Sequence, residues 1–365
     1  MRAVGIDVFL WRAGDVNPLI DRVDTAKIRG LTSPARRTQR PFPSASICMH
    51  KTLVIMNSTA AQGRTGRLQS EIRHRLSGDT EFVETKEGGH AERLAFDAAR
   101  ADYETIVAAG GDGTIHEIAN GILLSGNQHV RLGLLPLGSG NDYAAACGIP
   151  RKWQDALEFL QSGESSRVDV GEVCDANGRR QFFVNTLGLG LSGEIALEAR
   201  SIRRFRGMMK YGMATLKAVA RRRRILNTVI MLDDIRDSFR TMCLFVALGH
   251  REGGGFVVAP PAKIDDGWFD CLHVSDLSVV SILRYLPGLI RGVIPVHPGI
   301  RSFRCQTMTL ESDGPLVVHL DGEPFIQPED EQHRITVRLI PHALNVCCRL
   351  PVSALSRLGK GDRNQ

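Results

Sequence analysis

Residues 105–114 read TIVAAGGDGT, and this stretch decides the predicted fold. An apolar strand over 105–109 runs into glycines, and a helical pattern follows over 115–124. Glycines at such a turn let the backbone approach a ligand closely, and amides at the helix N-terminus donate to phosphate oxygens. Asp112 suits a phosphate loop only if it holds the loop or acts through Mg²⁺, whereas Thr114 can cap the helix. The alternative is an ordinary glycine-rich turn.

A second glycine-rich loop follows the next predicted strand. Residues 132–136 are apolar, and residues 135–142 read LPLGSGND. Two such loops at successive strand ends form a phosphate cradle. The pattern G-x-x-x-x-G-K-[ST] does not occur in the sequence, which disfavours a P-loop NTPase.

The surrounding pattern predicts an α/β domain followed by a β-rich one. An apolar strand over 52–56 and helical patterns over 67–76 and 89–101 precede the first loop. Apolar strands that alternate with helices indicate a parallel sheet covered on both faces, with ligands at the carboxyl ends of its strands. After about residue 168 few helices separate the strands, which indicates an antiparallel domain. Its predicted strands are 182–185, 228–232, 242–248, 269–274, 308–310, 316–320 and 335–339, and its predicted helices 202–223 and 278–291.

The composition is that of a soluble globular protein with one large or two ordinary domains. The chain has 365 residues, of which 43% are hydrophobic and 24% charged. The formal charge of +6 favours nucleic acid, an anionic membrane surface or phosphorylated substrates, without choosing among them. The 8 cysteines show no zinc-type spacing and indicate free thiols. No apolar run reaches the roughly 18–20 residues that span a bilayer.

Residues 1–48 are predicted to be a disordered N-terminal extension. The segments 33–37 and 40–44 are basic and broken by prolines, as in a linker. Asp7 interrupts the first apolar stretch, so no signal peptide is predicted.

Four ordered motifs carry a resemblance to a known family. Residues 110–114 resemble the nucleotide loop of the diacylglycerol kinase catalytic domain, and residues 136–142 resemble its second loop. Residues 263–268 and 321–323 resemble two further motifs of soluble bacterial lipid kinases. The superfamily includes sphingosine and ceramide kinases and is related more distantly to NAD kinases and 6-phosphofructokinases. The resemblance covers roughly residues 50–351.

The resemblance implies two domains with a catalytic cleft between them. Residues 49–170 would form a Rossmann-like, parallel-sheet nucleotide domain that binds ATP. Residues 171–342 would form a β-rich sandwich domain for the lipid substrate, and residues 343–355 a strand that returns to the first domain.

The resemblance also implies a set of nucleotide-binding residues. The first ATP loop, Asn-Pro-x-x-Gly in the family, carries Ser58 in place of the proline and Ala61 in place of the glycine. His116 stands where many relatives have asparagine, and Asp142 and Asp169 match acidic positions that organise metal and water. The implied nucleotide-binding residues are Asn57, Ser58, Thr59, Ala60, Ala61, Thr85, Gly111, Asp112, Gly113, Thr114, Ile115, His116, Glu117 and Ser139.

Glu323 matches the general base that is proposed for the family, and Asp112 is the second predicted catalytic residue. A lipid hydroxyl must lose its proton as it attacks the γ-phosphorus, and a carboxylate can accept that proton. Positioning and charge neutralisation by Mg²⁺ supply the rest of phosphoryl transfer. The alternative for residues 321–323 is a plain hairpin turn, since Asp-Gly is a strong turn signal.

A metal site is implied in the second domain. Lys263 and Trp268 would contribute main-chain oxygens and Asp266 its carboxylate, a ligand set that suits Mg²⁺. The alternative is again an Asp-Gly turn.

Two further segments are open to more than one interpretation. Residues 188–193 fit G-x-G-x-x-G, but arginines follow where a dinucleotide site needs an acidic residue, so a tight turn is predicted. Residues 200–224 combine many arginines with apolar side chains. They predict a helix that lies on an anionic membrane, a nucleic-acid patch or a solvated face.

The sequence therefore predicts ATP-dependent phosphorylation of a lipid hydroxyl, with diacylglycerol to phosphatidate, a step of phospholipid biosynthesis, as the leading reaction. The alternatives are a sphingosine or ceramide kinase, an NAD kinase-like enzyme, and a nucleotide-binding regulator without catalysis. The expected partners are ATP, Mg²⁺, a membrane lipid alcohol and an anionic membrane surface, and no nucleic acid. The expected location is the cytoplasm, with peripheral binding at the inner membrane face. A homodimer is left open.

Overall fold

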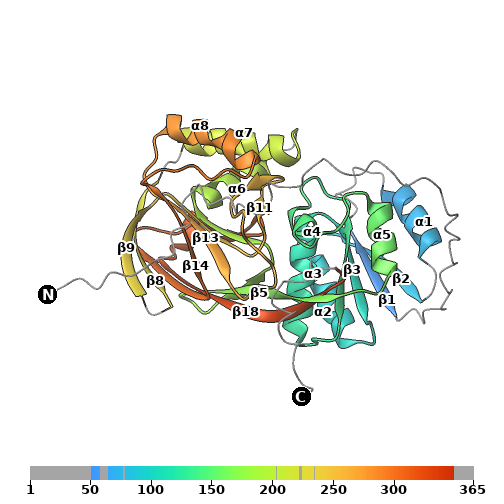
Figure 1. Ribbon diagram of the computed structural model, residues 1–365. Helices are drawn as coiled ribbons and strands as arrows, with labels where there is room; N and C mark the ends of the chain where they lie inside the picture. Colours follow the sequence, from blue (N-terminus) through green and yellow to red (C-terminus); the bar gives the residue numbers. More distant parts are fainter. Residues whose placement is uncertain are drawn as a thin grey trace, which may run out of the picture.

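The structure is a computed structural model that describes residues 51–57, 65–76, 79–202, 204–221, 224–233 and 235–348. The predicted extension 1–48 lies outside these residues. Within them the chain forms two lobes side by side (Figure 1), an α/β lobe and a β-rich lobe. The fold class predicted from the sequence is confirmed.

The first lobe is built on a parallel sheet in the order β2-β1-β3-β4. Every residue of β1 and β3 is buried, which explains why their sequences are apolar throughout rather than alternating. The strands are β1 (Thr52–Met56), β2 (Thr80–Glu84), β3 (Thr105–Gly110) and β4 (Arg131–Pro136). The helices are α1 (Thr65–Arg75), α2 (His90–Arg100), α3 (Asp112–Ser125), α4 (Asp142–Ala146) and α5 (Trp153–Gln161).

The second lobe is a sandwich of two mainly antiparallel sheets. One sheet has six strands in the order β14-β13-β10-β7-β16-β17. It packs against a second layer formed by β18, β15, β8 and β5. In the shared core Phe183 stacks on Phe269 with ring centroids 5.6 Å apart. The first strands are β5 (Ser166–Asp175), β6 (Arg180–Phe183), β7 (Thr186–Gly190), β8 (Leu226–Leu232), β9 (Ile235–Thr241) and β10 (Cys243–Ala247). The others are β13 (Phe269–Val274), β14 (Ile300–Cys305), β15 (Thr307–Ser312), β16 (Val318–Leu320), β17 (Glu323–Ile326) and β18 (Arg334–Val346).

Strand β18 joins the two lobes into one sheet. It pairs with β15 and β5 in the second lobe, and its last residues, Asn345 and Val346, pair in parallel with β4 of the first. His342 has a φ of 51°, and the pairing with β5 is irregular between Ile340 and Leu344. The strand therefore bends as it passes from one lobe to the other.

Three helices cover the outer face of the six-stranded sheet (Figure 1). They are α6 (Leu191–Ser201), α7 (Gly207–Arg221) and α8 (Val279–Ile290). The sequence predicts helix at 202–223 and 278–291 but not at 191–201, where α6 forms directly after β7. A short hairpin, β11 (Arg251–Glu252) and β12 (Phe256–Val257), lies between these helices and the first lobe, and a 3₁₀ turn, Pro328–Asp330, precedes β18.

Candidate functional site

A cleft of about 1120 Å³ lies between the two lobes. From the first lobe it is lined by loops that follow the carboxyl ends of β1, β2, β3 and β4. From the second lobe it is lined by the start of β7, the segment between α6 and α7, the β11–β12 hairpin and residues 321–323. The cleft therefore brings together three of the four sequence motifs.

The two glycine-rich loops touch through their backbones. A β-carbon placed on Gly138 would lie 2.4 Å from Cα of Gly111, which is closer than any real side chain permits. The amides of Leu137 and Gly138 donate to the carbonyl of Gly110 at 2.9 and 3.1 Å. Asn141 closes the second loop, because its amide group both accepts from and donates to the backbone of Gly138. Glycine at 138 is thus required for the loops to form one surface, and a β-carbon on Gly111 would lie only 3.2 Å from Cα of Gly138.

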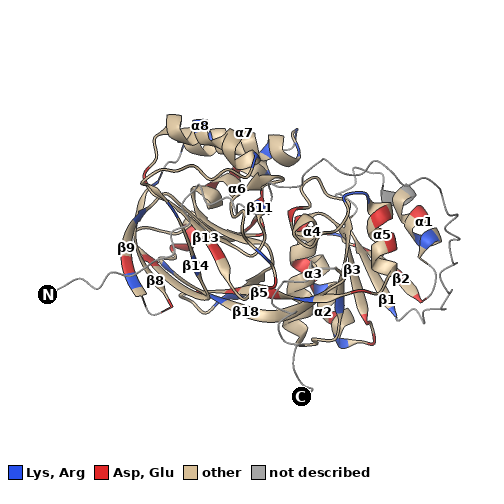
Figure 2. Ribbon diagram, viewed as in Figure 1, with Lys and Arg blue, Asp and Glu red and all other residues tan. Residues whose placement is uncertain are grey.

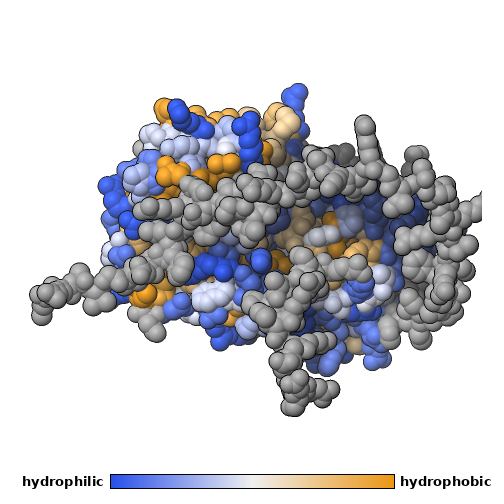
Figure 3. Space-filling model, viewed as in Figure 1, coloured by the Kyte–Doolittle hydropathy of each residue, from blue (hydrophilic) through white to orange (hydrophobic). Residues whose placement is uncertain are grey.

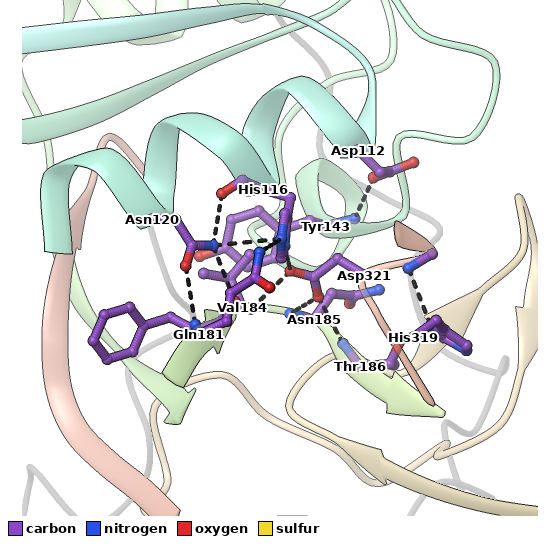
Figure 4. Close-up of polar contacts among 12 residues, drawn as sticks. Asp112, His116, Asn120, Tyr143, Gln181, Val184, Asn185, Thr186, His319 and Asp321 are labelled. Atoms are coloured by element: carbon purple, nitrogen blue, oxygen red, sulfur yellow. Dashed lines mark hydrogen bonds and ion pairs between the residues drawn. The ribbon is translucent and has the colours of Figure 1, made fainter. Parts of the chain in front are cut away.

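Asp112 holds the second loop to the first turn of α3. Its carboxylate accepts the backbone N–H of Asn141 at 2.8 Å. It also accepts the backbone N–H of Tyr143 at 3.2 Å (Figure 4). Burial raises its pKa despite these hydrogen bonds. Asp142 accepts the N–H of Gly254 from the opposite lobe at 2.6 Å, and burial together with the charge of Asp112 raises its pKa to about 7. A pair of crowded carboxylates therefore faces the cleft.

Most other predicted nucleotide-binding residues of the first lobe that the structure describes also line the cleft. Asn57 donates to the hydroxyl of Thr114 at 3.2 Å, and Thr85 and Ser139 lie in the lining. Glu117 accepts the N–H groups of Gly89 and Ala91 and so holds the start of α2. The predicted residues Ser58, Thr59, Ala60 and Ala61 lie outside the described residues.

The side chains of Ile115 and His116 do not line the cleft. Ile115 packs in the core of the first lobe. His116 is buried between the lobes, where its Nδ1 lies 2.8 Å from Asp321 Oδ2 and its Nε2 lies 2.9 Å from the amide nitrogen of Gln181 (Figure 4). Desolvation lowers the pKa of His116, but the hydrogen bond and charge of Asp321 outweigh it, so the net shift is upward. His116 thus ties α3 to the second lobe.

Asp321 and Gly322 form a two-residue hairpin turn between β16 and β17, and Glu323 is the first residue of β17. Asp321 and Gly322 have φ values of 53° and 90°, as a tight turn of this kind requires. The Asp321 carboxylate accepts the N–H groups of Val184, Asn185 and Thr186 (Figure 4). The local structure is therefore a hairpin turn, as the alternative interpretation of these residues has it, and the anchoring of Asp321 fixes where Glu323 points.

Glu323 reaches the first turn of α3. A β-carbon placed on Gly113 would lie 2.7 Å from Oε1 of Glu323, so the carboxylate sits directly over the glycine-rich loop. The positive end of the helix dipole favours a negative charge there. The two residues lie 210 positions apart in the sequence, and the hairpin turn brings them together.

Three basic residues line the cleft, although the sequence predicts them on a helix surface. Arg200 lies in the last turn of α6, Arg206 precedes α7, and Lys210 lies in the first turn of α7. Figure 2 shows the charges along these helices. Their proximity to the glycine-rich loops comes from tertiary folding, and no motif in the sequence reveals it.

The predicted metal site forms a turn outside the cleft. Both carboxylate oxygens of Asp266 are already partnered, one with the N–H of Trp268 and the other with the guanidinium of Arg304. Asp169 does not line the cleft but accepts the N–H groups of Gly267 and His342. Among the described residues no group of three or more His, Cys, Asp or Glu side chains could hold a metal ion. The guanidinium of Arg304 occupies one carboxylate oxygen of Asp266. This arrangement does not fit a structural Mg²⁺, so no step is assigned to that site.

An apolar cavity adjoins the cleft. It lies between the six-stranded sheet and helices α6, α7 and α8, and its volume is about 130 Å³. Tyr211, Glu252 and Gly253 line both the cavity and the cleft. The other lining residues are mostly aliphatic or aromatic, among them Ile195, Phe245, Leu272, Ile282 and Leu289. The sequence gives no sign of this cavity, because its walls come from separate segments.

Comparison with known proteins agrees with this architecture. Residues 51–173 match the family model described as diacylglycerol kinase catalytic domain, and residues 185–348 match the YegS C-terminal NAD kinase beta sandwich-like domain. A protein of Chromohalobacter salexigens named "Probable lipid kinase YegS-like" is 32% identical over 292 residues, 76% of this chain and 88% of its own. A protein of the same name from Yersinia enterocolitica is 30% identical over 315 residues, 83% of this chain and 98% of its own.

A solved structure shares the fold. The crystal structure described as a diacylglycerol kinase from Bacillus anthracis aligns with a TM-score of 0.63 at 20% identity and covers 82% of this chain and 97% of its own. The match to the catalytic-domain model, over residues 51–173, includes both glycine-rich loops. The chain therefore belongs to the diacylglycerol kinase catalytic-domain family, a family of lipid kinases.

No helix in the part of the chain that the structure describes is both long enough and apolar enough to cross a bilayer.

Proposed function

We propose that the protein transfers the γ-phosphoryl group of ATP to the hydroxyl of a membrane lipid, with diacylglycerol as substrate and phosphatidate as product. The observation that carries this proposal is the apolar cavity that opens onto the cleft at Tyr211, Glu252 and Gly253. The cavity of about 130 Å³ would take only part of an acyl chain, and the polar head would then lie in the cleft, beside the turn that carries Glu323. A soluble substrate such as NAD has no use for this cavity.

ATP would lie along the glycine-rich loops. The first-turn amides of α3 face the cleft and can donate to phosphate oxygens. Arg200, Arg206 and Lys210 would neutralise phosphate charge from the opposite wall. Asp112 acts on this site by holding the two loops together.

Mg²⁺ would accompany ATP. The cleft carries Asp112, Asp142 and Glu323, and such hard oxygen donors, together with phosphate oxygens, suit this ion. Burial and the neighbouring charge of Asp112 raise the pKa of Asp142, and a bound cation would favour its ionised form. When bound, Mg²⁺ supplies charge neutralisation on the phosphates.

Glu323 would act as the general base. Its carboxylate lies over Gly113, where the γ-phosphate would sit, and is exposed to the cleft. An acceptor hydroxyl between the carboxylate and the phosphate would lose its proton to Glu323 as the new P–O bond forms. The anchored turn at Asp321 keeps the carboxylate in place before substrate binds.

Replacement of the carboxylate tests this assignment. Glu323→Gln keeps the shape of the side chain but cannot accept the proton, so kcat on dispersed diacylglycerol should fall about 100-fold or more. The matched control is Glu329→Gln, because Glu329 is exposed and lies outside the cleft lining. Unchanged turnover of Glu323→Gln would remove Glu323 as the base.

The surface of α7, α8 and residues 293–296 would dock on an anionic membrane. Nine of the thirteen exposed large apolar side chains in the described residues lie there, and Figure 3 shows hydrophobic residues gathered over these helices. Neither helix carries an acidic residue, while Lys217, Arg221 and Arg284 supply positive charge. Helices α7 and α8 also form one wall of the apolar cavity, so docking of this surface would bring the cavity to the lipid. The nine residues are Met209, Met213, Leu216, Val279, Val280, Leu283, Ile290, Val293 and Val296.

A sphingosine or ceramide substrate remains the alternative that the same site could accept, since both offer an apolar chain and a hydroxyl. Rates of phosphate transfer to diacylglycerol, sphingosine and ceramide, measured one acceptor at a time, would separate these alternatives.

A further inference from the structure

The glycine-rich segment 188–193 makes room for a buried histidine. A β-carbon placed on Gly188 would lie 2.1 Å from Nε2 of His319, and one on Gly193 would lie 2.4 Å from the carbonyl oxygen of Val317. Gly190 has a φ of 70° at the turn from β7 into α6. The three glycines thus let β16 and α6 pack closely against β7, and the segment serves this packing rather than a dinucleotide.

His319 holds the hairpin turn through a hydrogen bond to its backbone. Its Nδ1 accepts the backbone N–H of Gly322 at 3.1 Å (Figure 4). Because Nδ1 accepts a hydrogen bond, the proton of the neutral ring lies on Nε2. Nε2 lies 3.0 Å from Oε1 of Glu252 and 2.7 Å from the hydroxyl of Ser192, which itself donates to Glu252 at 3.0 Å. The imidazole is almost completely buried, so its tautomer and orientation are fixed.

We propose that His319 is a positioning residue for Glu323, and this inference rests on the proposed role of Glu323 as the base. Asp321 fixes one residue of the turn through three backbone N–H groups. His319 fixes the other residue, Gly322, which is bonded directly to Glu323. The Glu252 carboxylate and Ser192 hold the imidazole so that Nδ1 faces the turn. Loss of the acceptor at Nδ1 would release Gly322 and let the carboxylate drift from the γ-phosphate.

Two substitutions test the roles of the two ring nitrogens of His319 separately. In His319→Asn the side-chain oxygen can occupy the place of Nδ1 and still accept from Gly322. In His319→Gln the amide nitrogen can occupy the place of Nε2 and donate to Glu252, but nothing accepts from Gly322. We expect His319→Asn to keep kcat within about threefold of wild type. We expect His319→Gln to lower kcat by about 10- to 100-fold with the KM for ATP unchanged, because a displacement of about 1 Å costs that much.

The measurement is steady-state kinetics on both variants, with thermal unfolding to show that both are folded to the same extent. Equal kcat values for the two variants would overturn the inference, and so would a loss confined to the KM for ATP. A positioning role also predicts that His319→Gln causes no further loss in a Glu323→Gln background, because both changes remove the same interaction. A full additional loss in that double variant would contradict it.

Glu323→Gln measured in parallel separates this inference from the proposed function. If Glu323→Gln is inactive while His319→Gln and His319→Asn turn over equally, only the positioning role fails. If Glu323→Gln keeps the turnover of wild type, the base assignment fails, whatever the histidine variants do.

Discussion

At the scale of single residues, the glycine-rich loops bring carboxylates to one wall of the cleft, and the opposite wall brings most of its cations. The first lobe contributes Asp112 and Asp142, and the second contributes Arg200, Arg206 and Lys210 together with the carboxylate of Glu323. Triphosphate between these walls would meet backbone amides and cations on its oxygens, while the carboxylates would meet Mg²⁺. This division explains why the loops carry acidic residues although they are predicted to hold phosphate.

Lys210 tests the cationic wall. Lys210→Ala removes an ammonium group that lines the cleft, and we expect the KM for ATP to rise about tenfold, since a charge-assisted hydrogen bond contributes about 1.5–3 kcal/mol. The matched control is Lys152→Ala, because Lys152 is exposed and lies outside both the cleft lining and the proposed membrane-docking surface. Initial rates over a range of ATP concentrations give both values. Equal KM values for the two variants would show that Lys210 does not contact the nucleotide.

Asp142 makes stability depend on pH. Burial and the charge of Asp112 raise its pKa to about 7 in the folded protein, against about 3.9 in an unfolded chain. The folded state therefore binds more protons between these values, and its stability falls as pH rises from about 4 to about 7.

Asp142→Asn should remove this dependence, because asparagine can still accept the N–H of Gly254 but carries no charge. Without nucleotide or metal, we expect the Tm of the variant to exceed that of wild type by a few degrees at pH 8 and to match it near pH 4. Thermal unfolding across this pH range is the measurement. A variant that is less stable at pH 8 would show that Asp142 does not carry an unfavourable charge.

At the scale of helices and strands, the proposed membrane-docking surface can be tested apart from catalysis. It consists of α7, α8 and residues 293–296. Val280 and Leu283 on α8 are 76% and 40% exposed. Aspartate at both positions should reduce co-sedimentation with vesicles of phosphatidylcholine and phosphatidylglycerol about tenfold, because it adds charge to an apolar contact. Activity on a short-chain, water-soluble diacylglycerol should stay near that of wild type.

Met231 and Ile235 supply the control for that experiment. They are 42% and 49% exposed on β8 and β9, away from α7 and α8. Aspartate at these two positions should leave vesicle binding unchanged. If both double variants lose binding equally, exposed apolar area rather than this particular surface drives the association.

Sequence periodicity predicted strands with a clear apolar pattern and missed several strands without one. The apolar strands at 52–56 and 105–109 are buried along their whole length, as the sequence predicts. Strands β2 and β9 have no clear apolar pattern because most of their side chains are partly or fully exposed, and they form by pairing with a neighbour. Helix α6 was missed because its glycine-containing start resembles a turn.

The candidate site was predictable where a local motif carries it. The glycine-rich loops and residues 321–323 meet in the cleft, although nothing in the local sequence shows that Glu323 faces Gly113. Arg206, Lys210 and His319 were not predicted as site or support residues, because each acts only through contacts made by the folded chain. The metal motif at 263–268 forms a turn, but the partner of Asp266, Arg304, lies 38 residues away and could not be foreseen.

At the scale of the whole molecule, the cleft exists because one sheet runs through both lobes. Strand β18 pairs with β15 on one side of its bend and with β4 on the other, and β5 pairs with it on both sides. The His116–Asp321 contact, which is buried, joins α3 to the hairpin turn across the same boundary. The nucleotide loops and the candidate base are thus held by a continuous structure, and the apolar cavity lies next to them.

Transfer of labelled phosphate from ATP to lipid tests the central proposal most directly. Purified protein is incubated with Mg²⁺, γ-labelled ATP and one acceptor at a time: dispersed diacylglycerol, sphingosine, ceramide or NAD. We predict label in the organic phase with diacylglycerol, at a rate at least tenfold above that with the other acceptors, and about 100-fold less label with Glu323→Gln. Label in NAD, or in none of the lipids, would contradict a lipid kinase with this site.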